Sequence, residues 1–174
     1  MRTYLQIFIM GISTGMRTLA GPSLLSSYLS RRYEALPARR LLRLFAGRWS
    51  VALLRLGALG ELVGDKLPMT PSRLEPEGLA GRLSSGALVG LMLAGARGKS
   101  RLLGMALGMA GAGLGAVGGY QTRHDIVEDS GLPDSLIALV EDAVAYGGGW
   151  LILRLGGGPA LPGSALPDVA VEED

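Results

Sequence analysis

Residues 12–22 read ISTGMRTLAGP, and this stretch sets a charged side chain, Arg17, inside a segment that is otherwise apolar. The segment predicts a first helix from about Tyr4 to Tyr28. Pro22 removes a backbone donor and its ring clashes with the preceding turn, so we expect this helix to break near Ala20–Pro22. A charge inside hydrocarbon is costly and is normally kept only where it faces a partner or water within a helical bundle.

Composition places the chain among membrane proteins. Its 174 residues have a mean hydropathy of +0.34, and 18% of them are charged, against roughly 25% in ordinary soluble domains. Apolar runs recur at lengths near the roughly 20 residues that a helix needs to cross a bilayer. We therefore expect an all-α fold, a polytopic transmembrane bundle of about five helices.

This transmembrane domain would occupy residues 1–155. Four further helices are expected, at about Leu44–Gly64, Leu79–Ala96, Leu102–Tyr120 and Pro133–Arg154. A polar and mostly acidic loop, from Gln121 to Asp134, would join the last two. Residues 156–174 are rich in Gly and Pro and then acidic, which is typical of a disordered C-terminal tail.

Basic residues gather after the first and third predicted helices, at residues 31–48 and 97–101. Positively charged loops stay on the cytoplasmic side of a membrane. Five spans would then put the N-terminus outside and the C-terminus in the cytoplasm, in a multi-pass protein of the cell (inner) membrane. If the segment 44–64 is re-entrant, both the number of spans and the orientation change.

Several functional classes lack support in the sequence. Cysteine is absent, which excludes disulfides, thiolate metal sites and cysteine nucleophiles. The basic patches lack interleaved aromatic residues, so we expect no nucleic-acid partner. No Ser-His-Asp or zinc-site spacing occurs, so triad hydrolase chemistry is not supported, and we expect no cofactor. The single histidine, His124, lies beside Asp125, and whether it holds a metal is left open.

Two acidic residues share one helix face near the end of the second predicted helix. Glu61 and Asp65 are four residues apart, and Lys66 follows directly. One interpretation is a cation or proton site at the mouth of a cavity in the bundle. The other is a set of interfacial charges at a helix end, with Lys66 extending to the lipid headgroups. Glu61 lies one turn deeper and favours the first interpretation.

Glu141-Asp142 is the strongest functional signal, because apolar residues flank the pair on both sides. Adjacent side chains on a helix point about 100° apart, so both carboxylates fit only against a wide polar or paired interior. Ionisable residues within spans serve as proton relays. The alternative is a structural ion pair with Arg17 or Arg55 that only holds helices together. Arg17 stays ionised and needs a partner, for which we expect Glu141 or Asp142.

Glycines recur at four-residue spacing in the third and fourth predicted helices. Small residues at this spacing let helix backbones approach closely in lipid. The pattern, a glycine zipper, predicts close helix packing and favours a homodimer. The glycines concerned are Gly86, Gly90, Gly104, Gly108, Gly111, Gly115 and Gly119.

Two motifs stand close together in the middle of the chain. Residues 60–68 read GELVGDKLP, and residues 82–87 read RLSSGA. With Gly11–Pro22, they resemble a family of small bacterial integral membrane proteins that is catalogued only as a domain of unknown function. The resemblance covers Gly11 to Gly90 and implies a membrane protein, but it implies no activity. The candidate site residues that fall on its motifs are Arg17, Glu61, Asp65, Lys66 and Arg82.

Together these features predict a small transporter or channel with a polar cavity that opens outward and a small solute or ion as its cargo. The carboxylates would bind a cation or carry protons, and Arg17 would pair with them or bind an anionic group. An accessory membrane protein with static ion pairs is the alternative, and an intramembrane enzyme acting on lipid headgroups is a third, less favoured one. The predicted cavity residues are Arg17, Glu61, Asp65, Glu141 and Asp142, supported by Lys66, Arg82 and Arg55.

Overall fold

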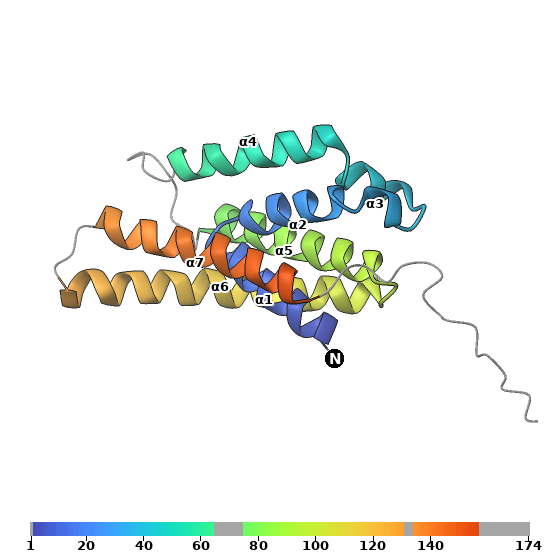
Figure 1. The fold of residues 1–174 in the computed structure, drawn as a ribbon. Helices are drawn as coiled ribbons and strands as arrows, with labels where there is room; N and C mark the ends of the chain where they lie inside the picture. Colours follow the sequence, from blue (N-terminus) through green and yellow to red (C-terminus); the bar gives the residue numbers. More distant parts are fainter. Residues whose placement is uncertain (1, 65–74, 131–133, 157–174) are drawn as a thin grey trace, which may run out of the picture.

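The computed structural model describes residues 2–64, 75–130 and 134–156, except for the side chains of residues 124, 127–130, 134 and 135. All regular structure in these residues is helical, and the long helices lie side by side in a bundle (Figure 1). The described residues form seven α-helices where the sequence predicts five. They are α1 (Arg2–Met16), α2 (Ala20–Ser30), α3 (Arg40–Phe45), α4 (Arg48–Gly64), α5 (Pro76–Ala96), α6 (Arg101–Ser130) and α7 (Asp134–Leu155), with a 3-10 helix, η1 (Tyr33–Ala35), after α2.

The segment predicted as one broken helix forms a hairpin of two helices. The chain reverses between α1 and α2, so α2 runs back toward the end of the bundle where α1 begins (Figure 1). Arg97, which follows α5, contacts both Gln6 of α1 and Tyr28 of α2, and these contacts bring the two outer ends of the hairpin together. The prediction of a single span from Tyr4 to Tyr28 is therefore wrong.

The interruption also lies upstream of its predicted position at Pro22. Leu19 is the N-cap of α2, so Pro22 is the third residue inside that helix. The first N–H groups of a helix have no intrahelical partner, and a residue without an N–H therefore fits there. The break consequently falls on Arg17–Leu19, before the first turn of α2.

Helices α5, α6 and α7 are long and apolar enough, by length and composition, to cross a membrane. Their candidate spans are Pro76–Ala96, Arg101–Arg123 and Leu136–Leu155. Helix α6 continues to Ser130, so the loop predicted to begin at Gln121 is wrong over residues 121–130. Polar and charged side chains such as those of Gln and Arg are good helix formers, and they allow α6 to extend beyond its apolar part.

The segment predicted as one helix over Leu44–Gly64 is divided into α3 and α4, which are separated by Ala46 and Gly47. Helix α4 packs chiefly on α2 and leaves much of its apolar surface uncovered. Leu53 and Val63, for example, are each about two-thirds exposed. With 17 residues, α4 lies at the lower end of the range of about 17–25 residues for a membrane-spanning helix.

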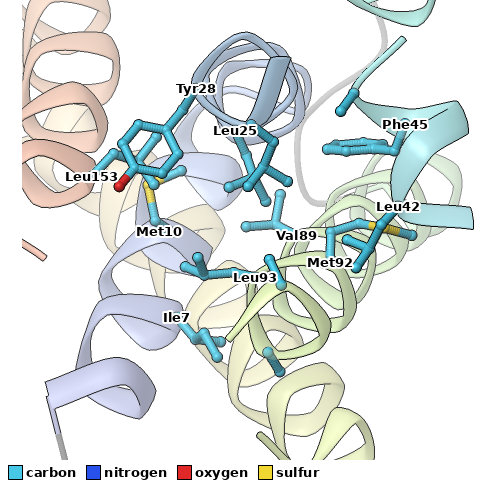
Figure 2. Packing of buried hydrophobic residues seen from close by; sticks show 14 of the residues in the cluster. Ile7, Met10, Leu25, Tyr28, Leu42, Phe45, Val89, Met92, Leu93 and Leu153 are labelled. Atoms are coloured by element: carbon cyan, nitrogen blue, oxygen red, sulfur yellow. The ribbon is translucent and has the colours of Figure 1, made fainter. Parts of the chain in front are cut away.

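The apolar core lies where α1, α2, α5 and α7 meet. Met10 of α1, Leu25 of α2 and Leu93 of α5 are completely or almost completely buried and point toward one another (Figure 2). Leu153 of α7 and Phe45 of α3 extend the same cluster. The core fixes both arms of the α1–α2 hairpin, and the turn between them is thereby held inside the bundle.

Helix α6 approaches α1 and α5 closely through glycines at four-residue spacing. A Cβ atom added at Gly108 would collide with the backbone carbonyl of Gly86 in α5. One added at Gly115 would collide with the carbonyl of Ile12 in α1. The four-residue glycine spacing therefore serves contacts within one chain, and the homodimer stays a prediction.

Replacement of Gly108 by Ala should destabilise the fold by about 1–3 kcal/mol, because the added methyl group overpacks the contact between α5 and α6. Gly118→Ala on the same helix is the matched control, since nothing lies within 4 Å of its added Cβ atom. Ala is also the better helix former, so the control should be neutral or stabilising. Denaturant unfolding of the purified protein in detergent measures both changes, and equal stability of the two variants would contradict this packing.

Candidate functional site

The turn between α1 and α2, here called the hairpin tip (Arg17–Leu19), interrupts the helical hydrogen-bond pattern inside the bundle. The amide of Arg17 still donates to the carbonyl of Ser13 at 3.1 Å. The next two amides, of Thr18 and Leu19, and the last carbonyls of α1 find their partners outside the hairpin. Backbone polar groups in apolar surroundings must be satisfied by other parts of the protein, so the tip requires polar partners from neighbouring helices.

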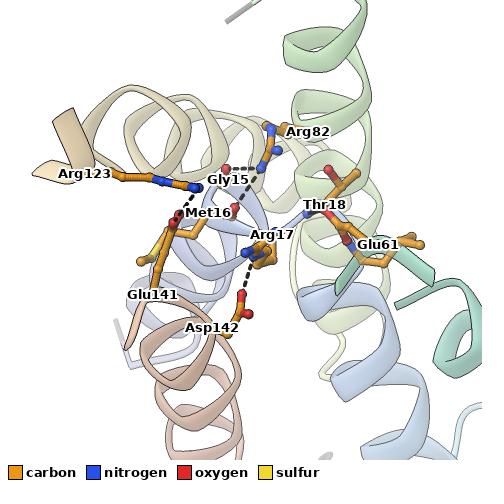
Figure 3. Close-up of polar contacts among 10 residues, drawn as sticks. Gly15, Met16, Arg17, Thr18, Glu61, Arg82, Arg123, Glu141 and Asp142 are labelled. Carbon is orange, nitrogen blue, oxygen red and sulfur yellow. Dashed lines mark hydrogen bonds and ion pairs between the residues drawn. The ribbon is translucent and has the colours of Figure 1, made fainter. Parts of the chain in front are cut away.

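Glu61 of α4 satisfies the amides at the start of α2. Its Oε1 accepts a hydrogen bond from the amide of Thr18 at 2.6 Å, and its Oε2 accepts one from the amide of Leu19 at 2.8 Å (Figure 3). A carboxylate at this position also faces the positive end of the α2 dipole. Glu61 is therefore an N-terminal cap supplied by a different helix.

Arg82 of α5 satisfies the carbonyls at the end of α1. Its Nη1 donates hydrogen bonds to the carbonyls of Gly15 at 2.7 Å and Met16 at 2.8 Å (Figure 3). Arg82 is only 5% exposed, and a positive charge is favourable at a helix C-terminus. The two half-helix ends at the tip are thus closed by opposite charges from two different helices.

Arg17 points from the hairpin tip toward α7, where its Nε pairs with Oδ1 of Asp142 (Figure 3). Arg17 is 1% exposed and Asp142 is 13% exposed. The sequence predicted Glu141 or Asp142 as the partner, and the structure selects Asp142. Because the pair is almost completely removed from water, loss of one partner would leave a buried and uncompensated charge.

Glu141, the neighbour of Asp142, faces a different helix. Its Oε2 lies 3.9 Å from Nη1 of Arg123 on α6. Glu141 also lines a cavity of about 310 Å³ between α1, α6 and α7, whose other walls are mostly apolar. The two adjacent carboxylates therefore serve separate partners, as their angular separation on a helix requires.

Three positive and three negative side chains, from the hairpin tip itself and from α4, α5, α6 and α7, thus form a network around the tip. The charges compensate one another, but each carboxylate contacts a different group: the backbone amides of the tip, Arg17 or Arg123. Protonation of any one carboxylate would weaken the contact it makes, because hydrogen bonds to an ionised group are stronger than neutral ones. The members of this tip network are Arg17, Arg82, Arg123, Glu61, Glu141 and Asp142.

Of the remaining predicted site residues, the structure describes only Arg55, which is not part of this network. Arg55 donates from its Nε to Oγ of Ser27 at 2.9 Å, in an exposed position on α4. Asp65 and Lys66 lie outside the described residues. The side chain of Arg17 is only 1% exposed, whereas the sequence predicted that it lines a polar cavity that opens outward.

Sequence analysis missed two residues near the tip, Arg123 and Tyr146. Arg123 was assigned to a loop, although it continues the four-residue spacing of Gly115 and Gly119 and lines the same cavity as Gly119. Tyr146 follows Asp142 by four residues and therefore shares its face of α7. Both residues could have been found by continuing the four-residue spacing from Gly119 to Arg123 and from Asp142 to Tyr146.

Among the described residues, no group of three or more His, Cys, Asp or Glu side chains converges on one point. The side chain of His124 lies outside the described part of the chain.

Comparison with protein-family models, with curated proteins and with solved structures found no match for this chain. The resemblance of Gly11 to Gly90 to a family of small bacterial membrane proteins therefore stays a prediction.

Asp142→Asn should destabilise the protein by about 3–5 kcal/mol, because it leaves Arg17 charged and buried without its counter-charge. The double variant Arg17→Met/Asp142→Leu should recover most of this loss, since it replaces both charges by apolar groups. A double-mutant cycle of Arg17→Met, Asp142→Leu and the double variant, built from unfolding free energies in detergent, measures the coupling between the two residues. Simple additivity of the two single variants would mean that the ion pair does not stabilise the tip.

Proposed function

We propose that this protein is a small membrane transporter or channel in which the α1–α2 hairpin acts as the gate. The observation that carries the proposal is the interrupted helix pair, whose tip lies inside the bundle and is closed by Glu61 and Arg82 from two other helices. Interrupted helices with charged groups at their ends recur at the substrate sites of secondary transporters. The expected cargo is a small solute or ion, coupled to protons or a cation.

Protons would open the gate by weakening the two carboxylate contacts that close it. Protonation of Asp142 removes the counter-charge of Arg17, and protonation of Glu61 weakens its bonds to the amides of Thr18 and Leu19. The released amides and Arg17 then offer hydrogen-bond donors and positive charge to an anionic group of the solute. Loss of the protons restores the closed tip.

We place the basic end of the bundle in the cytoplasm. Residues 31–48 and 97–101 carry most of the arginines, and both segments lie at the end where the chain begins and where α7 terminates (Figure 1). By the positive-inside rule, this end faces the cytoplasm. The hairpin then re-enters from the cytoplasmic side, α4 to α7 cross the membrane, and both termini are cytoplasmic. This arrangement departs from the external N-terminus expected from the sequence.

Single-cysteine labelling tests this topology cleanly because the chain has no cysteine. In intact cells, a membrane-impermeant thiol reagent should label Asp125→Cys and leave Lys99→Cys unlabelled until the cells are opened. A protease site placed at the N-terminus should likewise be cleaved by added protease only after the cells are opened. Cleavage of that site from outside would show that the hairpin spans the membrane and does not re-enter.

A static accessory protein is the second candidate, and one observation favours it. Arg17 is 1% exposed and paired with Asp142, as expected for an ion pair that only holds helices together. In that case the hairpin never moves and the network contributes stability alone. The third expectation, an enzyme acting on lipid headgroups, stays a prediction.

The discriminating experiment locks the hairpin tip. The side chain of Leu19 lies against Gly57 of α4, so the pair Leu19→Cys/Gly57→Cys can be joined by a short bifunctional thiol reagent. Crosslinking should abolish proton flux into proteoliposomes, as read by a trapped pH-sensitive dye, and cleavage of a reducible crosslinker should restore the flux. Each single-cysteine variant, treated identically, is the control.

Full proton flux through the crosslinked protein would sink the gating proposal. Absence of flux from the uncrosslinked protein at every imposed gradient would favour the static alternative.

A further inference from the structure

A long groove runs along the surface of the bundle between α2, α4 and α7, and we call it the α2–α4–α7 groove. It has a volume of about 840 Å³, which lies within the range of about 300–1,000 Å³ typical of ligand sites. Helix α4 packs on α2, and α7 packs on α1 and α2, so α2 forms the floor and a space remains between α4 and α7. Its walls are mainly apolar, and include Leu24, Leu59, Leu62 and Leu153.

Charge in the groove has one sign. Four of the lining residues are arginines, and none of the described residues that line it is acidic. Arg32 lies over the ring of Tyr28 at 4.2 Å, and Arg154 lies over the ring of Trp150 at 4.7 Å. Arginines held by aromatic rings in this way are suited to bind a phosphate group through two parallel hydrogen bonds.

Three of the groove's arginines lie at one end of the groove, and its other end lies near the hairpin tip. Arg31 and Arg32 follow the end of α2, and Arg154 lies in the last turn of α7, so these three arginines mark the basic end of the bundle. Toward the hairpin tip, the groove reaches Ser23 and Tyr146. From Arg154 to Tyr146, α7 rises about 12 Å. One leaflet of a bilayer is about 15 Å thick in its hydrocarbon part, so the groove matches the length of a single acyl chain in that leaflet.

We propose that the α2–α4–α7 groove binds an anionic phospholipid from the leaflet at the basic end of the bundle. The phosphate pairs with Arg32 and Arg154, and one acyl chain lies along the leucines between α4 and α7. The partly exposed side chains of Leu59 and Trp150, at 58% and 48%, leave the groove open for a lipid to enter sideways. This lipid site goes beyond the proposed gate, because it requires neither movement of the hairpin nor transport.

Trp150 lies in the wall of the groove and serves as the reporter. The chain has two tryptophans, so Trp49→Phe leaves Trp150 as the only one. This variant is reconstituted into vesicles of zwitterionic phosphatidylcholine that contain increasing fractions of phosphatidylglycerol with brominated acyl chains. Bromine quenches tryptophan fluorescence on contact, and brominated phosphatidylcholine in unlabelled phosphatidylglycerol gives the reciprocal measurement.

We expect Trp150 to be quenched preferentially by the anionic lipid, with a relative binding constant of about tenfold over the zwitterionic one. Arg32→Gln/Arg154→Gln in the same background should reduce this preference to about twofold or less, because each surface arginine contributes a factor of roughly five. Arg32→Lys/Arg154→Lys should retain part of the preference, since it keeps the charges but loses the paired hydrogen bonds.

The matched control is Arg39→Gln/Arg43→Gln, which removes two exposed arginines at the same end of the bundle but outside the groove. Its preference should equal that of the parent variant. Equal quenching by the two brominated lipids, or the same loss in the control pair, would overturn the proposal. Protection of Trp150 from both lipids would overturn it as well, since a second copy or another helix would then cover the groove.

Discussion

Backbone polar groups at the hairpin tip must be satisfied inside an apolar bundle, and the arrangement of the other helices follows from this need. Each unsatisfied amide or carbonyl would cost about 1–3 kcal/mol. Glu61 removes the cost at the start of α2, and Arg82 removes it at the end of α1. Helices α4 and α5 must therefore pack where they bring these two side chains to the tip.

The helices on one side of the tip pack closely, and α4 on the other side packs with few buried residues. Helix α6 lies against α1 and α5 so closely that several of its glycines admit no Cβ atom. Helix α4, by contrast, packs chiefly on α2 and shows little buried surface. Interiors with close packing resist deformation, so a movement that releases the tip would involve α4 and α2 rather than the glycine contacts.

The hairpin tip and the α2–α4–α7 groove lie next to each other. Tyr146 lines the inner end of the groove and also lies near Arg17, Glu61 and Asp142. A lipid in the groove would cover the open face between α4 and α7, which borders the charged network. The low dielectric of an acyl chain strengthens electrostatic contacts nearby, so an occupied groove would favour the closed and fully paired tip.

Local patterns in the sequence were sufficient to predict the helical class and the long apolar helices α5 and α7. They also indicated that Arg17, Glu61 and Asp142 need polar partners, because an ionisable residue within an apolar run needs a partner wherever it lies. The reversal of the chain at the tip could not be predicted from local sequence patterns and was seen only in the tertiary structure. It depends on Glu61 and Arg82, which lie 43 and 67 residues from the backbone groups they satisfy. Pro22 indicated only a missing donor, and contacts between such distant residues leave no periodic pattern from which a turn could be predicted.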